Sequence, residues 1–431
     1  MKKILLIAVF TIISINYAFS VTLTEALIQT YKNNTELNAE RENVKVSQKD
    51  LIISKADYLP SASITGSKSK EKTNKLTNQG GGDDSITDVD PVIATIKLEH
   101  TLVDFGRDAE YKKKKIGINL AEAKLLKKEQ DIFYKAIEAY SGLILANEKL
   151  TINQINLSLL ERQVETDKVR LERGQITVSD LAQSESSLAG AQAQFIQAKN
   201  EIVTNKLNYE NIIGKILNPK SLEKTSESIV SIPQSLNSAI DLSKQNNPDI
   251  TIAKLELEQS EKDIEIAESD LKPTATLSLE RSYSDNLNTT YDKKEKDVLK
   301  ATVSWPFYSG GKKRVTISKN QNLKTRKRLL LDNAIKTNDT IVATAWANLQ
   351  SSKSFLNFVR LQVRAAQIAN EGITAEYERG SGRTTLDVIQ SNTLLLNAKV
   401  SLSNSERNYL LAQYNLLKSV GLLNSTYLKL E

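Results

Sequence analysis

The side chains that enzymes use most often are scarce in this chain. It contains no cysteine, which excludes disulfides, thiol nucleophiles and thiolate metal sites. The only histidine, His100, lies in a stretch that alternates like a β-strand, and catalysis by histidine needs a positioned partner. Gly80 to Gly82 lack the lysine and the serine or threonine of a phosphate-binding loop. We therefore expect no enzyme, no cofactor and no metal site, and we interpret His100 as a polar break in an outward strand face.

Two short segments repeat glycine, threonine and aspartate in the same order. They are Gly174, Thr177 and Asp180, and Gly380, Thr384 and Asp387. Threonine at an N-cap with an acid three residues later forms a capping box, and glycine ends the preceding helix. Each segment therefore predicts a turn between two helices. If several chains assemble around an axis, an exposed aspartate at such a turn also becomes part of a ring of like charge, and the two interpretations are compatible.

The two turns belong to an internal duplication. Asn34 and Pro60 recur 213 positions later in the chain, and Thr177 and Asp180 recur 207 positions later. Each copy is expected to form a helix, a strand pair, a long helix, a turn and a final helix. The predicted domains are a signal peptide (1–20), a first repeat (21–216, strands about 61–105), a linker (217–235), a second repeat (236–421, strands about 273–308) and a tail (422–431).

The first twenty residues have the composition of a secretory signal. Lys2 and Lys3 precede an apolar run from Ile4 to Ile15, and small residues follow at Ala18 and Ser20. A retained anchor helix is the alternative, but the run is shorter than the ~20 residues that a span needs. We expect export to the periplasm of a Gram-negative type of envelope. The formal net charge of +6 is mild for 431 residues, and no nucleic-acid partner is expected.

Proline-free stretches leave room for two long helices. We expect them at about Arg107 to Glu172 and Lys312 to Glu378, each roughly 100 Å long at 1.5 Å per residue. Helices of this length need partner helices along their whole extent, and each is expected to fold back on its successor as a coiled-coil hairpin. Each repeat is expected to open with one helix, from Thr22 or Thr24 to just before Pro60 and from about Ser235 to Lys272.

Alternating apolar and polar residues predict four strands of about ten residues, two in each repeat. Strands of this length, when tilted, cross an outer membrane, but four cannot close a barrel and an open edge is not tolerated in hydrocarbon. Several chains would then share one barrel, with polar tips at Gly80 to Asp84 and at Asp285 to Lys296 facing outward. A soluble hairpin packed on helices is the alternative interpretation, and the strand from Ser61 to Ser69 has the weakest pattern.

Basic clusters follow each strand pair, at Lys112 to Lys115 and at Lys312 to Arg314. Such a cluster is most simply a solvated helix start. Alternatively, the two clusters form basic bands just inside the membrane that meet lipid headgroups or line a lumen. Trp305 and Tyr308, beside the second cluster, have the composition of an interfacial aromatic girdle and favour the membrane placement.

Landmarks along the chain resemble those of the TolC family of outer-membrane efflux and type I secretion channel proteins. They are Leu23, Glu25, Ala26 and Leu27; Pro60; Asp104 to Gly106; Gly174 with Asp180; Pro273; Tyr308, Gly310 and Gly311; Tyr377; Gly380; Arg383 to Asp387; and Tyr409 to Gly421. The resemblance covers essentially the whole mature chain. It implies a mainly α protein with membrane β-structure: a homotrimer whose twelve strands share one barrel, continued by an α-helical barrel in the periplasm.

The resemblance also implies a passive exit duct in the cell outer membrane. Its partners would be outer-membrane lipid, a periplasmic adaptor (membrane fusion) protein and an inner-membrane ABC or proton-driven transporter. The segments from Arg383 to Leu386 and from Tyr409 to Leu417 are more similar to the type I protein secretion branch than to the drug-efflux members. The alternative from another class is a soluble periplasmic coiled-coil adaptor without a pore, although this chain has two hairpins and adaptors have one.

The resemblance assigns the gate of such a duct to the two turns. Tyr377 and Arg383 match an aromatic and a basic residue that bond to the first turn and hold the entrance shut, with Ser179 and Asp180 as the acceptors. Asp387 matches an aspartate ring at the entrance. A second acidic ring three residues later is replaced here by Gln390, and Gly382 adds one residue to the turn.

Overall fold

The computed structural model describes residues 21–73, 87–216, 218–224, 231–287, 292–380 and 382–430. The predicted signal peptide, the predicted tip at Gly80 to Asp84 and parts of the predicted linker lie outside these residues. The chain forms two compact units, one comprising Ala39–Lys127 with Pro248–Asn338 and the other comprising Met1–Asn38, Lys128–Asn247 and Asp339–Glu431.

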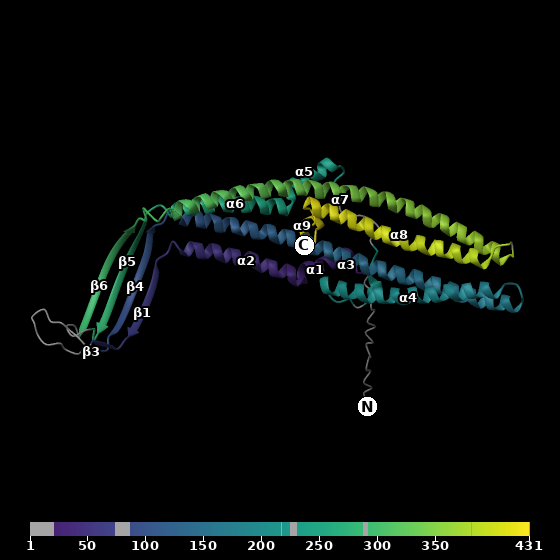
Figure 1. The fold of residues 1–431 in the computed structure, drawn as a ribbon, viewed down its shortest axis with the longest axis horizontal. Coiled ribbons are helices and arrows are strands. Elements are labelled where there is room, and N and C mark those ends of the chain that lie inside the picture. The colour runs from purple at the N-terminus through teal and green to yellow at the C-terminus, as the bar shows by residue number, and fades with distance from the viewer. Residues whose placement is uncertain are drawn as a thin grey trace, which may run out of the picture. The chain divides into compact units, whose positions relative to one another are not determined.

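Apart from the short strands β2 and β3, which occur in the first half alone among the described residues, the main helices and strands follow one another in the same order in the two halves of the chain (Figure 1). The first half contains α1 (Leu23–Asn33), α2 (Thr35–Ala56), β1 (Ser61–Lys68), β2 (Glu71–Thr73), β3 (Thr87–Val89), β4 (Val92–Val103), α3 (Arg107–Glu172), α4 (Val178–Ile212) and a 3-10 turn η1 (Pro219–Ser221). The second half contains α5 (Leu236–Asn246), α6 (Pro248–Ser269), β5 (Thr274–Asp285), β6 (Lys293–Ser304), α7 (Lys312–Glu378), α8 (Thr385–Val420) and α9 (Ser425–Leu428).

Corresponding helices of the two halves have nearly equal lengths. α1 and α5 have 11 residues each, α2 and α6 have 22 each, and α3 and α7 have 66 and 67. The predicted ends of both long helices are confirmed. Among the described residues, none of the helices is both long enough and apolar enough to cross a membrane.

The prediction of one opening helix in each repeat was wrong, because each is broken at an asparagine. Asn34 and Asn247 have extended backbones, with ψ of 124° and 122°. The Asn34 side-chain oxygen accepts a hydrogen bond from the Leu37 N–H at 3.1 Å, which caps α2. Pro248 follows Asn247 and disfavours a helical conformation at the residue before it.

Four antiparallel strands form one sheet in the order β1-β4-β5-β6. Residues opposite one another share a face, so one face carries a row formed by Ala62, Leu98, Leu279 and Leu299. The other face carries Ser63, Lys97, Glu280 and Val298, which is a largely polar row. The predicted alternation is confirmed, and within the described chain β1 and β6 each have one unpaired edge.

The bounds of the last strand differ from the prediction. β6 begins at Lys293 and pairs with β5 up to Asp285, so part of the predicted polar tip at Asp285 to Lys296 is strand. The strand also ends at Ser304, before Phe307, because Pro306 has no N–H to donate to a ladder. β1 spans Ser61–Lys68 and ends one residue before the predicted strand from Ser61 to Ser69.

The first basic cluster contains ion pairs, and in the second the Lys313 ammonium donates to the Asp270 carbonyl oxygen. Lys112 and Lys113 form ion pairs with Asp108 and Asp263, each at 2.7 Å, as expected for a solvated helix start. Lys312 and Arg314 are exposed.

In the unit that contains Lys128–Asn247, a buried core connects the start of the described chain to the predicted linker. Phe133, Ile137 and Tyr140 of α3 are fully buried, as expected from their spacing in the sequence. The Tyr140 hydroxyl lies 2.8 Å from the Val21 carbonyl oxygen and 2.7 Å from that of Glu223. Burial raises the pKa of Tyr140 well above its usual value, which keeps this hydrogen-bond donor protonated.

Candidate functional site

Capping boxes start both helices that follow the turns, as the sequence predicted. The Thr177 Oγ1 accepts a hydrogen bond from the Asp180 N–H at 3.3 Å, and the Asp180 carboxylate accepts one from the Thr177 N–H at 2.9 Å. At the second turn the Asp387 N–H donates to Thr384 Oγ1 at 3.2 Å, and the Thr384 N–H donates to the Asp387 carboxylate at 2.8 Å. Gly380 is left-handed, with φ of 73°, and ends α7.

These hydrogen bonds also fix the charge of the two aspartates. Donation from the backbone N–H and then from the hydroxyl of Thr177 lowers the pKa of Asp180 below its ordinary value of 3.8. Thr384 lowers the pKa of Asp387 in the same way. Both turns therefore carry a carboxylate that stays ionised at neutral pH.

Tyr377, near the end of α7, is buried and bound on two sides. Its hydroxyl donates to Asp167 Oδ1 of α3 at 3.1 Å and lies 2.9 Å from Thr385 Oγ1 of α8. Because a tyrosine has one hydroxyl proton, the Thr385 hydroxyl is the donor of the second bond. The Arg170 guanidinium lies 4.2 Å from the centroid of the Tyr377 ring, at a cation–π distance.

Asp167 is a fully buried carboxylate, with an exposed fraction of 0%. It accepts hydrogen bonds from three side chains: the Tyr377 hydroxyl, the Ser184 hydroxyl of α4 at 2.5 Å and the Gln163 amide at 3.0 Å. A buried charge is tolerated only where hydrogen bonds satisfy it. We call Asp167, Tyr377, Ser184, Thr385 and Gln163 the Asp167 cluster, and it joins α3, α4, α7 and α8 close to both turns.

Sequence reasoning identified Tyr377 but missed Asp167. The signal was present, because Leu160, Val164 and Asp167 step by four and three residues along the buried seam of α3. An acid at a seam position of a coiled coil is a strong indication of a specific polar contact. The predicted acceptors, Ser179 and Asp180, lie at the start of α4, whereas Asp167 lies within α3, before the turn.

Arg383 and Asp180, the predicted partners, both have local contacts in this chain. The Arg383 Nε donates to the Glu376 carboxylate at 2.6 Å on the surface of the second hairpin. The Asp180 carboxylate is occupied by Thr177, and Ser179 is exposed. The structure therefore brings Tyr377 to the first hairpin, but it does not bring Arg383 to Ser179 or Asp180 within one chain.

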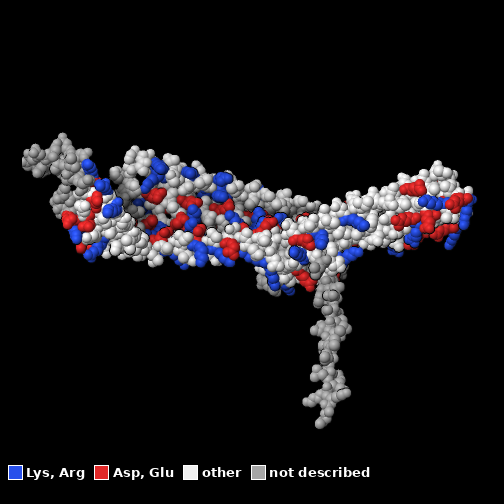
Figure 2. All heavy atoms as spheres, turned by 90° about the horizontal axis from the view of Figure 1, so that it is seen from below, with Lys and Arg blue, Asp and Glu red and all other residues white. Residues whose placement is uncertain are grey.

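The residues predicted for the entrance ring lie on the first turn of α8. Asp387 is half-buried and its capping bonds use Oδ2, while Gln390 is exposed one turn later. Ser381, within the same turn, lies outside the described residues. Figure 2 shows acidic and basic side chains intermingled at the end of the molecule where the two turns lie. The site is thus a polar contact between helices with a charged rim, and its chemistry is binding and charge.

Comparison with known proteins identifies the family. The profile of the family described as "Outer membrane efflux protein" matches residues 26–215 and 239–422. The chain belongs to the outer membrane efflux protein family. The resemblance to the TolC family found in the sequence is thereby confirmed, and with it the location of this efflux protein in the outer membrane.

Individual relatives of this efflux protein match along nearly the whole chain. It is 26% identical to the outer membrane efflux protein BepC of Brucella suis, over 98% of this chain and 90% of BepC. It is 22% identical to the proteases secretion protein PrtF of Dickeya chrysanthemi, over 98% of this chain and 93% of PrtF. A pore-less adaptor is not favoured by these relatives.

Its fold is also that of solved outer-membrane channels. The CmeC outer membrane channel of Campylobacter jejuni superposes with a TM-score of 0.81 at 16% identity, covering 93% of this chain and 85% of CmeC. The expected fold class, a helical barrel part joined to a membrane β part, is confirmed by this likeness. The efflux protein is therefore a relative of channel proteins, in sequence and in fold.

Proposed function

We propose that this protein is the passive exit duct of a tripartite efflux or type I protein secretion system, and that it works as a homotrimer. One observation carries the proposal: a four-stranded antiparallel sheet with one apolar face and two unpaired edges, attached to helices of 66 and 67 residues. Exposed backbone at a sheet edge is not tolerated in hydrocarbon, so the edges require neighbouring chains. Three copies would give twelve strands, which is enough for a barrel.

Along the strands, the residues of the apolar face change in the order expected of a membrane barrel. Leu98, Leu279 and Leu299 lie in its middle. Towards the hairpin tip the same face becomes charged, where Arg281 approaches Glu295 at 3.3 Å. Towards α7 it ends at Trp305, which is exposed. A lipid-facing band limited by polar and aromatic residues is the pattern of outer-membrane barrels.

The proposed partners follow from the relatives. PrtF is named for protease secretion and BepC for efflux, so we propose that this chain receives its cargo from an inner-membrane ABC or proton-driven transporter through a periplasmic adaptor. We propose no catalytic step, no cofactor and no metal for the duct itself. The division into repeats of 21–216 and 236–421 and the removal of residues 1–20 stay predictions.

We propose that the turns close the periplasmic entrance. Within one chain, the Asp167 cluster ties α7 to α3 and so holds the second hairpin against the first. Between copies, we keep the prediction that Arg383 reaches Ser179 or Asp180 of a neighbour, which would require it to leave Glu376. An exposed ion pair such as Arg383–Glu376 is worth little, so exchanging it for another costs little.

Planar-bilayer recording of the purified protein tests the duct and its gate. The wild-type protein is expected to form channels of small conductance. The double variant Tyr377→Phe with Arg383→Ser should conduct several times more, because the variant cannot make the Tyr377–Asp167 bond or any Arg383 contact. Tyr409→Phe with Arg364→Ser makes the same changes away from the turns and should behave like the wild type. Absence of channels, or release of the protein from outer membranes by carbonate, would reject the duct.

A further inference from the structure

The polar face of the four-stranded sheet carries an excess of positive charge. Because residues opposite one another share a face, the strand register shows which charged side chains lie there. They are four lysines and two glutamates: Lys97, Lys294, Lys296 and Lys300, and Glu99 and Glu280. The other residues of this face are mostly serines and threonines. Hydroxyl and ammonium groups are hydrogen-bond donors, and they suit the binding of anions.

Two of these lysines have no acid directly opposite them. Lys296 of β6 is opposite Ser282 of β5, and Lys300 is opposite Ser278. Both lysine side chains are exposed, and neither forms an ion pair within the part of the chain that the structure describes. Their charge is therefore available to solutes in front of this face.

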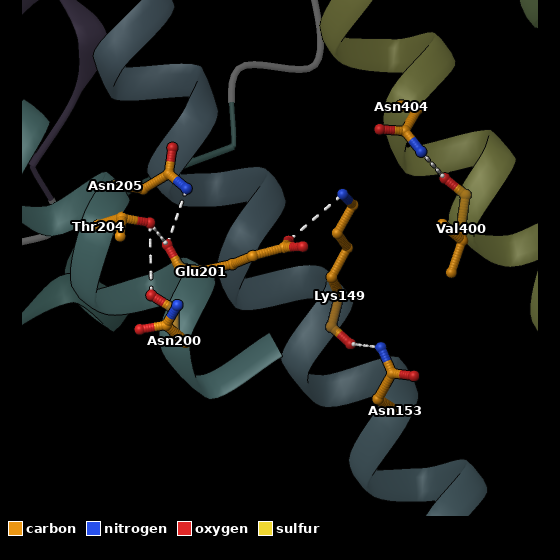
Figure 3. A network of polar contacts seen from close by, with 8 residues as sticks. All are labelled: Lys149, Asn153, Asn200, Glu201, Thr204, Asn205, Val400 and Asn404. Carbon is orange, nitrogen blue, oxygen red and sulfur yellow. Dashed lines mark hydrogen bonds and ion pairs between the residues drawn. The ribbon is translucent and has the colours of Figure 1, made fainter. Parts of the chain in front are cut away.

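The two glutamates of the polar face lie beside a different lysine. Lys97 and Glu99 of β4 form an ion pair, and Glu280 of β5 is directly opposite Lys97. Lysines of the helices are also paired in this way: Lys149 of α3 lies 3.4 Å from the Glu201 carboxylate of α4, and Figure 3 shows the two side chains pointing toward each other. On its polar face β6 carries three lysines and no acid, so the positive charge is concentrated on this edge strand.

Protection of an exposed edge is another explanation for lysines on β6, because charged side chains discourage an edge strand from pairing with other proteins. In the proposed ring, however, the β6 edge pairs with the β1 edge of the next copy and is no longer exposed. The polar face of β1 has no charged residue and consists of Ser61, Ser63, Thr65 and Ser67. The next copy therefore brings no acid to the lysines of β6.

Closure of the proposed barrel would arrange these lysines around its axis. Twelve strands spaced by ~4.8 Å and tilted by about 40° enclose a barrel with a backbone diameter of roughly 24 Å. Its axis is then about 12 Å from the wall, which is comparable to the Debye length of ~10 Å in 0.1 M salt. In 1 M salt the Debye length is only ~3 Å. The lysine charge should therefore act on solutes throughout the barrel at low salt and be screened at high salt.

We infer that the polar face of the sheet is an anion-attracting lining of the barrel. Lys296 and Lys300 attract chloride, and with the neighbouring hydroxyl groups they bind the phosphate or carboxylate groups of larger solutes. A lining of one sign of charge inside a low-dielectric wall raises the local concentration of counter-ions. This inference rests on the proposed duct, and it adds the charge preference of its membrane part. The preference is opposite in sense to that of Asp387, whose carboxylate favours cations.

Planar-bilayer recording in a gradient of potassium chloride tests this lining. The variant Lys296→Gln with Lys300→Gln is expected to have a ratio of chloride to potassium permeability several-fold lower than the wild type in 0.1 M salt, and a similar ratio in 1 M salt. Inorganic triphosphate added on the barrel side should reduce the current of the wild type more than that of the variant. The matched control is Lys68→Gln with Lys293→Gln, which removes two lysines from the apolar face of the same sheet and should leave the ratio unchanged.

A second variant keeps both lysines, and with them any protection of the edge. Ser278→Glu with Ser282→Glu places an acid directly opposite each lysine, where a cross-strand pair can form. The ratio of chloride to potassium permeability should fall as it does in the first variant. The yield of trimer should equal that of the wild type in both variants.

Each outcome separates this inference from the proposed function. Channels of both variants with the wild-type permeability ratio in 0.1 M salt would overturn the lining while leaving the duct intact. An equal change of the ratio in Lys68→Gln with Lys293→Gln would overturn the assignment of the polar face to the lining. Absence of channels in the wild-type protein would instead reject the proposed duct, and this inference with it.

Discussion

At the scale of residues, one carboxylate distinguishes the two hairpins. Ser184 of the first hairpin donates to Asp167, whereas the corresponding Ser391 of the second hairpin, 207 positions later, accepts from the amide of Asn370 at 3.0 Å. At this position the contact between the helices of the second hairpin is thus made by neutral polar side chains. The Asp167 carboxylate also accepts a hydrogen bond from the Tyr377 hydroxyl, and this bond connects the first hairpin to the second.

Asp167→Asn is expected to loosen this connection. The amide retains one acceptor oxygen and leaves at least one of the three donors without its partner, at a cost of about 1–3 kcal/mol. Amide hydrogen exchange in the last turns of α7 should accelerate by about 10- to 100-fold. Asp131→Asn is the control, since Asp131 forms a half-exposed ion pair with Lys418 that contributes little. Equal exchange in both variants would show that Asp167 does not hold α7.

The charge of Asp387, at the start of α8, should not titrate near neutral pH. The pKa of Asp387 is lowered by Thr384, so the stabilisation from its charged form is present above the ordinary value of 3.8 and is lost only as the pH falls below it. Asp387→Asn is expected to reduce cation preference, measured as a reversal potential in a salt gradient. In the wild type this preference should stay constant from about pH 5 to 8 with respect to this group. A midpoint within that range that disappears in Asp387→Asn would contradict the assignment.

At the scale of elements, the sequence predicted what depends on local chemistry. Glycine, threonine and aspartate at fixed spacing placed both turns. Proline-free runs left room for α3 and α7, whose predicted bounds are those observed. The sequence did not predict the break at Asn34, because a single extended residue hardly changes helical periodicity. The break at Asn247 was indicated by Pro248, which the prediction of one helix from Ser235 to Lys272 overlooked. It also missed Asp167, whose acceptor role depends on Tyr377, 210 positions later in the chain.

The end of α8 at Gly421 is fixed by the close approach of the Asn246 backbone. Gly421 ends α8 with φ of 86°, and a Cβ added there would lie 2.3 Å from the Asn246 carbonyl oxygen. Gly421→Ala should therefore destabilise the protein by at least about 1–2 kcal/mol. Gly190→Ala, inside α4 with open space around it, should instead stabilise by roughly 0.5–1 kcal/mol. Thermal unfolding followed by helical circular dichroism measures both, and a loss in Gly190→Ala equal to that in Gly421→Ala would contradict this explanation.

At the scale of the whole molecule, the edges of the sheet follow from the internal duplication of the chain. β1 and β6 are the two edge strands of the sheet, one from each repeat. The duplication thus gives the sheet two unlike edges, and unlike surfaces are what identical subunits need to form a closed ring.

The membrane placement of the sheet is testable by a charge on either of its faces. Leu299 lies on the apolar face and Thr302 on the polar face of the same strand. Leu299→Arg would place a charge against lipid, at a cost of about 2–4 kcal/mol per chain at the middle of the bilayer. The yield of heat-modifiable trimer in the outer membrane should fall strongly. Thr302→Arg, three residues away on the polar face, should assemble like the wild type. If Thr302→Arg is the variant that fails, the polar face is turned toward lipid and the barrel is oriented the other way.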